Sequence, residues 1–247
     1  MVKQFNIVLP TSWEELSDDQ MKMVFRLFAR DLSEGEVKTI CLLRWNKVKV
    51  LGKTDKGEYW LKTKAGLAMA TAREIYNLTR PLDFMNDIPP RPVRLSRIGK
   101  HRPLNADFDG VPFEVYLYAD NLFQGYLHTE SFDLLKELVQ VLYNSEGIHP
   151  DKATCIMAFY WMASLKRLFA QRFSHFYQPM DMADANNMLQ GGSLHKTLME
   201  AVNAQIRALT GGDVTKEPFV MKMDTIRALT ELDCKAREVE DLKKQKS

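Results

Sequence analysis

Two short stretches of the sequence carry residue types at spacings that suit chemistry. In the first, Asn105-Ala-Asp107-Phe-Asp109-Gly110, oxygen-bearing side chains alternate before a glycine, as in the first half of a calcium-binding EF-hand loop. The twelfth position of such a loop is a bidentate glutamate, but here it is Tyr116, and prolines precede the stretch instead of a helix. We therefore interpret it as an acidic turn before a helix and expect no metal site.

The second stretch, Ser193-Leu-His-Lys196, matches the serine nucleophile pattern of penicillin-recognising enzymes. Its companion motifs are absent, and Ser193 after Gly191-Gly192 is better explained as a helix N-cap. No phosphate-binding glycine loop occurs, and no histidine has a second ligand at metal-binding spacing. The sequence therefore predicts no catalytic residue, no cofactor and no enzyme, although a site assembled across the fold stays open.

The middle of the chain is its basic region. Residues 44–102 hold 14 Lys and Arg against 5 Asp and Glu, a net charge of +9, whereas the whole chain has +2. Lys47 and Lys49 alternate with valines ahead of the turn Thr54-Asp-Lys-Gly57, which predicts a small β-hairpin over residues 46–63.

Four cations then recur every three residues in a proline-rich stretch. A polyproline helix has three residues per turn, so the four would share one edge and could follow a phosphate backbone. The predicted contacts with nucleic acid or an acidic partner are Lys47, Lys49, Lys53, Arg91, Arg94, Arg97 and Lys100. The alternative is a solvated linker with lysines that protect an edge strand from aggregation.

The elements around this region are expected to be helices, so the fold class is mainly α with one small hairpin. Capping boxes at Ser17–Gln20 and Ser33–Glu36 predict helices over residues 18–31 and 34–45, and a third at Thr11–Glu14 predicts a short turn of helix. Further helices are expected over residues 65–78, 131–144, 150–176, 193–209 and 217–244, with a loop at 181–192. Residues 113–118 suit either a helix or a strand.

Three segments follow from this pattern. Residues 1–80 are expected to hold the N-terminal helices and the basic hairpin, and residues 113–247 a C-terminal helical domain. Between them, residues 81–112 are expected to form a proline-rich basic linker or an extended arm, docked or free. An aromatic stripe on the helix that ends near residue 176 predicts either core or a protein interface through Phe169, Phe173 and Phe176.

The remaining features concern the compartment. Three cysteines far apart in the sequence argue against a disulfide framework and favour a reducing environment. No signal peptide or membrane-spanning stretch is visible, so we expect a cytoplasmic protein.

Several stretches also resemble known proteins: Trp13-Glu-Glu-Leu16, Leu42-Leu-Arg-Trp45, residues 159–166 and residues 204–216. Together they look similar to uncharacterised proteins encoded near tail genes in phages and prophages of anaerobic gut bacteria. The Gly-Asp-Val-Thr-Lys stretch that ends at Lys216 resembles tail-assembly chaperones. The resemblance implies a structural role in virion or tail assembly, in the cytoplasm of a bacterial host or in the virion, and it carries over no functional residue.

We therefore expect a non-catalytic assembly protein that acts through contacts with other protein subunits, its own copies or phage structural proteins among them. The alternative is a nucleic-acid-binding protein that uses the hairpin and the arginine-rich arm.

Overall fold

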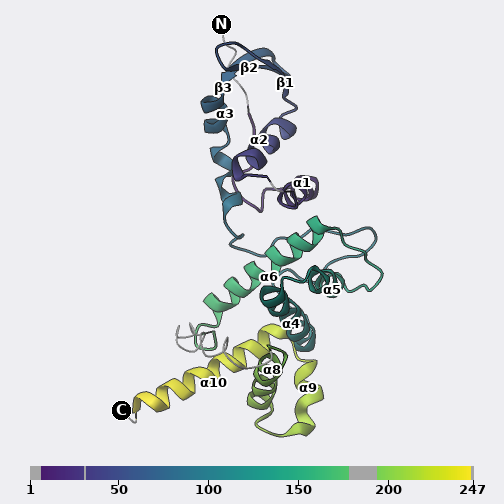
Figure 1. The fold of residues 1–247 in the computed structure, drawn as a ribbon. Helices are drawn as coiled ribbons and strands as arrows, with labels where there is room; N and C mark the ends of the chain where they lie inside the picture. The colour runs from purple at the N-terminus through teal and green to yellow at the C-terminus, as the bar shows by residue number, and fades with distance from the viewer. Residues whose placement is uncertain (1–6, 31, 178–193, 246–247) are drawn as a thin grey trace. The chain divides into compact units, whose positions relative to one another are not determined.

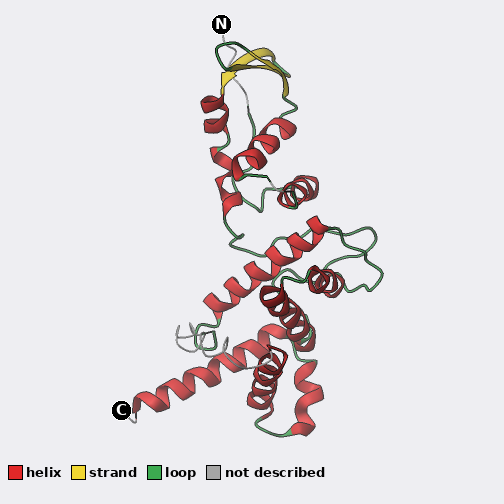
Figure 2. Cartoon of the chain, viewed as in Figure 1, coloured by secondary structure: helices red, strands yellow, loops and turns green. Residues whose placement is uncertain are grey.

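The computed structural model describes residues 7–30, 32–177 and 194–245 of the chain, and it is mainly helical, which confirms the predicted fold class. Within the described ranges, one small three-stranded antiparallel sheet lies in the N-terminal part (Figures 1 and 2). The chain forms two compact units. Unit 1 comprises residues 1–89 and 151–157, and unit 2 comprises residues 90–150 and 158–247.

The first two helices of unit 1 begin where their capping boxes predicted. Helix α1 (Asp18–Phe28) is capped by Ser17, whose hydroxyl accepts from the Gln20 amide at 3.3 Å while the Gln20 side chain accepts from the Ser17 amide at 3.0 Å. Helix α2 (Glu34–Trp45) begins in the same way at Ser33 and has the predicted bounds. The turn of helix predicted at Thr11 was wrong: residues 11–13 are bends and residues 14–15 form a turn.

The sheet of unit 1 has three strands where a two-stranded hairpin was predicted. Strands β1 (Lys49–Lys53) and β2 (Glu58–Thr63) pair as expected, and β3 (Gly66–Thr71) pairs with the other edge of β2. The helix predicted over residues 65–78 was therefore wrong in its first part. The Leu67-Ala-Met-Ala70 stretch favours helix by propensity, but pairing with β2 and burial of Ala68 and Ala70 override that preference.

A capping box at Thr71 and Glu74 starts the helix seven residues later than predicted, as α3 (Ala72–Leu78). A 3-10 helix, η1 (Arg80–Asn86), follows. Trp13 is buried in this unit, and its indole donates to the carbonyl oxygen of Phe84 at 3.0 Å. The ammonium of Lys38, almost fully buried, is 2.7 Å from Asp83. The indole N–H and the ammonium that unit 1 buries therefore both have a partner within the unit.

Unit 2 is helical. The alternative left open for residues 113–118 resolves as helix, since α4 spans Phe113–Thr129. It packs with α5 (Phe132–Leu142), with the part of α6 (Lys152–Arg172) from Ala158 onward, with α8 (Leu194–Thr210) and with α10 (Thr225–Gln245). Aromatic rings fill the interior, among them Phe108, Tyr116 and Trp161.

The proline-rich residues 90–112 belong to unit 2 and pack into it. Val93, Leu95, Phe108 and Val111 are each at most 6% exposed. The Tyr143 hydroxyl donates to the Leu95 carbonyl oxygen at 3.1 Å. Two further bonds run from the amide of Leu104 to the Leu142 carbonyl and from the Trp161 indole to the Ala106 carbonyl. Between the alternatives of a free and a docked segment, these contacts favour a docked one.

The helix predicted over residues 217–244 is broken in two. The short α9 (Glu217–Met221) ends before α10, because a bridge between Pro112 and Asp224 interrupts the helical ladder. The Phe113 amide donates to the Met223 carbonyl at 2.8 Å, and the Asp224 side chain then caps α10 through the Arg227 amide at 2.9 Å. The loop predicted at 181–192 lies outside the described residues.

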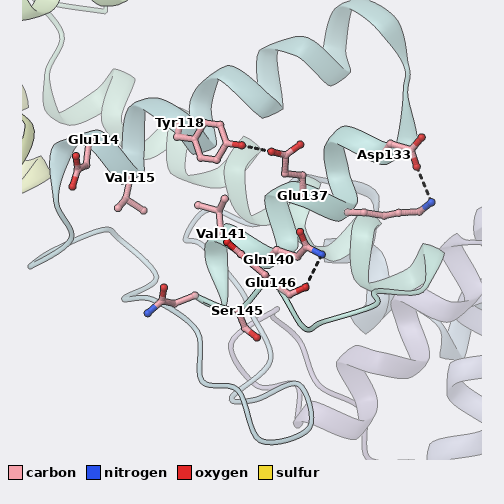
Figure 3. Close-up of a pocket in the computed structure, with 11 residues that line it drawn as sticks. Glu114, Val115, Tyr118, Asp133, Glu137, Gln140, Val141, Ser145 and Glu146 are labelled. Atoms are coloured by element: carbon pink, nitrogen blue, oxygen red, sulfur yellow. Dashed lines mark hydrogen bonds and ion pairs between the residues drawn. The ribbon is translucent and has the colours of Figure 1, made fainter.

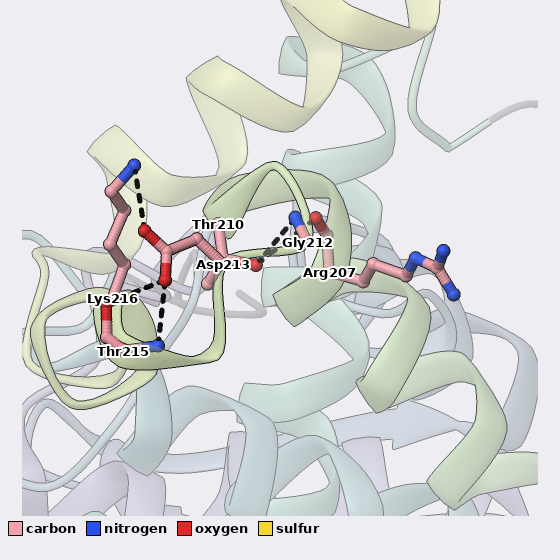
Figure 4. A network of polar contacts seen from close by, with 6 residues as sticks. All are labelled: Arg207, Thr210, Gly212, Asp213, Thr215 and Lys216. Atoms are coloured by element: carbon pink, nitrogen blue, oxygen red, sulfur yellow. Dashed lines mark hydrogen bonds and ion pairs between the residues drawn. The ribbon is translucent and has the colours of Figure 1, made fainter.

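The Gly-Asp-Val-Thr-Lys stretch has a local structural explanation (Figure 4). Gly211 and Gly212 have positive φ and end α8, and the Gly212 amide donates to the Arg207 carbonyl at 3.1 Å. Asp213 then caps the 3-10 turn η2 (Val214–Lys216) by accepting from the Thr215 amide and hydroxyl. These residues end one helix and begin the next element, so the contacts of the stretch are those of a helix end and a cap.

None of the helices that the structure describes is both long and apolar enough to cross a bilayer.

Candidate interaction surfaces

The acidic stretch that resembled half an EF-hand is a turn fixed by its own hydrogen bonds. The Asn105 side chain donates to the Asp109 carbonyl at 2.6 Å, and the Gly110 amide donates to the Asp224 carboxylate at 2.6 Å. Phe108, at the centre of the turn, is fully buried. The Asp107 carboxylate accepts from the Asp109 amide at 3.3 Å, so it too serves the turn. Across the described part of the chain, no three His, Cys, Asp or Glu side chains gather as a metal site. Ser193 lies outside that part.

A polar hollow lies between α4 and α5 of unit 2 (Figure 3). We call it the acidic hollow, because its charged side chains are four carboxylates and one ammonium: Glu114, Asp133, Glu137, Glu146 and Lys136. The phenol of Tyr118 donates to Glu137, and Lys136 is 2.8 Å from Asp133. The hydrogen bond to Glu137 raises the pKa of the Tyr118 phenol, which is the opposite of what a tyrosine base needs.

A partly buried polar cluster of unit 2 joins α4, α6 and the residues after α6. The Lys166 ammonium is 3.0 Å from the Asp120 carboxylate, and the hydroxyls of Tyr116 and Tyr177 are 2.5 Å apart. Burial, reinforced by the charge of Asp120, raises the pKa of Tyr116 far above its usual range, and burial likewise raises that of Tyr177. Both phenols therefore stay protonated at neutral pH. The cluster is a neutral pair of hydroxyls beside a matched ion pair, which is a means of holding helices together.

A groove in unit 1 has a different character. It lies between α1 and α2 and reaches β1, and six of the side chains that line it are apolar: Met23, Leu27, Ile40, Leu43, Val48 and Val50. Its charged side chains are four cations and one carboxylate: Lys22, Arg26, Arg30, Arg44 and Asp19. We call it the basic groove. Its lining is mixed, with an apolar floor and a net charge of +3.

The cations of the basic groove can be checked for counter-ions in the part of the chain that the structure describes. Among the described residues, no carboxylate lies within ion-pair distance of Lys22, Arg26, Arg30 or Arg44. Arg26 acts on Asp151 at longer range. Burial raises the pKa of that carboxyl, but hydrogen bonds from Thr154 and the charge of Arg26 outweigh burial and lower it overall. The groove therefore presents a positive field above an apolar floor, which is suited to an anionic partner with apolar side chains of its own.

The outer face of the sheet forms a second exposed surface in unit 1. Trp60 is 43% exposed and pairs across β1 with Gly52, where an added Cβ would meet nothing within 4 Å. Lys49 and Lys62 are paired with each other, and Lys62 lies two residues from Trp60, so it shares a face of the strand with the ring. An exposed indole beside lysines is suited to stacking with a planar base.

The seven predicted contact cations divide between the two units. Lys47, Lys49 and Lys53 are exposed at or next to β1 in unit 1, whereas Arg91, Arg94, Arg97 and Lys100 belong to unit 2. The polyproline edge predicted for the second group was wrong. Arg94 lies over the Trp161 ring at 5.8 Å with its Nε buried, and Ile98 and His101 exchange two hydrogen bonds around Gly99, which turns the chain.

The predicted protein interface is mostly core. Phe169 is fully buried and Phe173 is 3% exposed, and the two rings pack edge to face. Phe176 is half-buried against Tyr177. The sequence predicted either core or a protein interface for this aromatic stripe. Phe169 and Phe173 are core, because α6 buries one face in unit 2.

Sequence reasoning missed the basic groove, although a signal existed. Lys22, Arg26 and Arg30 are spaced by four residues, which places Lys22 and Arg26 on the same face of α1. Arg44 follows on α2, and only the packing of α1 against α2 brings it to the same groove.

Comparisons with known proteins give no further guide to these surfaces. No family model matches the chain, and no curated protein and no solved structure matches it either.

Proposed function

We propose that this chain is a non-catalytic assembly protein that acts by binding another protein through the basic groove of unit 1. The observation that carries the proposal is the mixed lining of the groove: six apolar side chains and four cations that have no ion pair among the described residues. Apolar area that closes against a partner supplies most of the binding energy, and complementary charges supply orientation and rate. The groove supplies both at one place on the surface.

Assembly of a phage tail or virion is the setting that the sequence resemblance implies for this proposal. The corresponding location is the cytoplasm of a bacterial host or the virion itself.

A peptide-display selection tests the proposed function and requires no identified partner. The full chain is used as bait, and selected peptides are tested again with the variant Lys22→Glu/Arg44→Glu, which reverses one charge on each helix of the groove. The control Arg73→Glu/Arg80→Glu makes the same change at exposed cations outside the groove. We expect binders that the control retains and the groove variant loses. Failure to select any peptide, or binders indifferent to the groove variant, would refute the function.

The second candidate is nucleic-acid binding through the sheet face, and the exposed Trp60 beside Lys62 favours it. Stacking of a base on the ring would be worth about 1–3 kcal/mol, and each phosphate contact would add a salt-dependence slope of roughly −0.7 on a single strand. A fluorescent oligonucleotide titrated with wild type and with Trp60→Ala/Lys62→Ala at several salt concentrations measures both quantities. The apolar floor of the groove has no use in phosphate binding, so we place protein binding first.

A further inference from the structure

The two charged surfaces of the chain match each other. The basic groove carries four cations and one carboxylate, and the acidic hollow carries four carboxylates and one ammonium. Their net charges are therefore equal and opposite, at +3 and −3. This inference rests on the proposed function and goes on to name the partner.

The spacing of the charges also matches. Lys22 and Arg26 are four residues apart on α1, and Asp133 and Glu137 are four residues apart on α5. Four residues of helix advance about 6 Å, so both pairs present their charges at the same interval along an axis. Each surface is formed by two neighbouring helices, so a helix ridge of one can lie in the groove of the other.

The acidic hollow also offers contacts for the apolar floor. Tyr118 is 48% exposed at its surface, and Val115 and Val141 line it. The carboxylates of Glu114 and Glu146 are exposed and have no ion pair within the described residues. The contact between Asp133 and Lys136 is a surface ion pair, which contributes little and yields readily to a new partner.

We propose that the occupant of the basic groove is a second copy of this chain, bound through its acidic hollow. The two patches are different, so the contact is heterologous. Each copy that joins leaves one groove and one hollow free, and copies therefore add head to tail into rings or filaments. Such growth is what an assembly protein requires.

Light scattering of the full chain over a range of concentrations, at roughly 0.05 M and 1 M salt, tests the proposal. The groove variant is Lys22→Glu/Arg44→Glu, and the hollow variant is Glu137→Lys/Glu146→Lys. Matched controls outside both surfaces are Arg73→Glu/Arg80→Glu and Glu231→Lys/Glu238→Lys. Circular dichroism melts show which variants are folded.

We expect wild type and controls to grow in mass with concentration at low salt, and each variant alone to lose more than about tenfold in association. A mixture of the two variants should associate again, because the unchanged groove of one meets the unchanged hollow of the other. This recovery also excludes misfolding as the cause of the loss.

Three results would overturn the proposal. These are wild type that stays monomeric at every concentration, self-association that either folded variant retains, and a mixture that fails to associate. Monomeric wild type with groove-dependent peptide binders would leave the proposed function standing, with a different partner. Monomeric wild type without such binders would remove both.

Discussion

The two units can be compared by whether their cations have a close partner. In unit 2, Lys166 is paired with Asp120, and Arg94 covers the ring of Trp161. In unit 1, the buried Lys38 is paired with Asp83, but the cations of the basic groove have no close counter-ion among the described residues. In both units these buried or half-buried cations therefore have partners: Lys38, Arg94 and Lys166. Cations without an ion pair among the described residues line the basic groove of unit 1.

This difference separates residues that stabilise the molecule from residues that are free to bind. Exposed like charges repel one another, so they lower the free energy of unfolding slightly and contribute nothing to packing. A substitution in the groove should therefore change binding and spare stability, whereas a substitution in a paired cluster should do the reverse.

The largest expected effect concerns the interior of unit 1. Burial raises the pKa of the Cys41 thiol to about 12, whereas Cys234 is half-buried in unit 2. At pH 8 only about one Cys41 in 10⁴ is then a thiolate, the form that reacts. We expect iodoacetamide to modify Cys234 long before Cys41, as peptide mass spectrometry over time would record. Equal rates would mean that unit 1 is open inside as well as at its surface.

Two tryptophans sharpen the contrast between core and surface. Trp161 of unit 2 is fully buried and Trp60 of unit 1 is 43% exposed. Trp161→Ala should lower the free energy of unfolding by about 3–5 kcal/mol, because it leaves a cavity and an unpaired Ala106 carbonyl. Trp60→Ala should change it by less than about 0.5 kcal/mol. Urea denaturation followed by circular dichroism measures both, and similar losses would contradict the distinction.

A smaller loss is expected when a paired cation of unit 2 loses its partner. Asp120→Ala strands the ammonium of Lys166, which is 23% exposed, and should cost about 2–3 kcal/mol of stability. The double variant Asp120→Ala/Lys166→Met removes the stranded charge and should recover part of that loss. If the double variant is as unstable as the single one, the stranded charge of Lys166 is not the cause of the lost stability.

The smallest effect is expected in the basic groove. Lys22→Ala/Arg44→Ala removes two charges that have no ion pair among the described residues, so the free energy of unfolding should shift by less than about 0.5 kcal/mol. Thermal melts at low and high salt would measure the shift. A loss comparable to that of Asp120→Ala would show that these cations serve the fold and would count against their role in binding.

Local signals in the sequence were enough for several elements. The capping boxes at Ser17 and Ser33 set the starts of α1 and α2, because each is complete within four residues. Strand β3 was missed for the opposite reason. Its Leu-Ala-Met-Ala sequence has no strand preference, and only pairing with β2 and burial against Leu61 make it a strand.

The candidate surfaces depended on tertiary structure in the same way. All five positions of β1 are exposed, so the alternation of a strand does not explain the exposure of Lys49. Nothing in the spacing of Arg94 shows that it lies over the ring of Trp161, 67 residues later. The basic groove likewise needs α1 and α2 to pack before Lys22 and Arg44 share a surface.

The central claim is that the groove of one copy meets the hollow of another, and a zero-length cross-link tests it directly. Copies labelled with ¹⁵N are mixed with unlabelled copies at low salt, treated with a carbodiimide that joins amines to carboxylates, and digested for mass spectrometry. Lys136 and Asp133, 2.8 Å apart within one copy, provide an internal reference. We predict mixed-isotope peptides that join Lys22 to Asp133 or Glu137. Recovery of the reference cross-link without any mixed-isotope link to Lys22 would contradict the account.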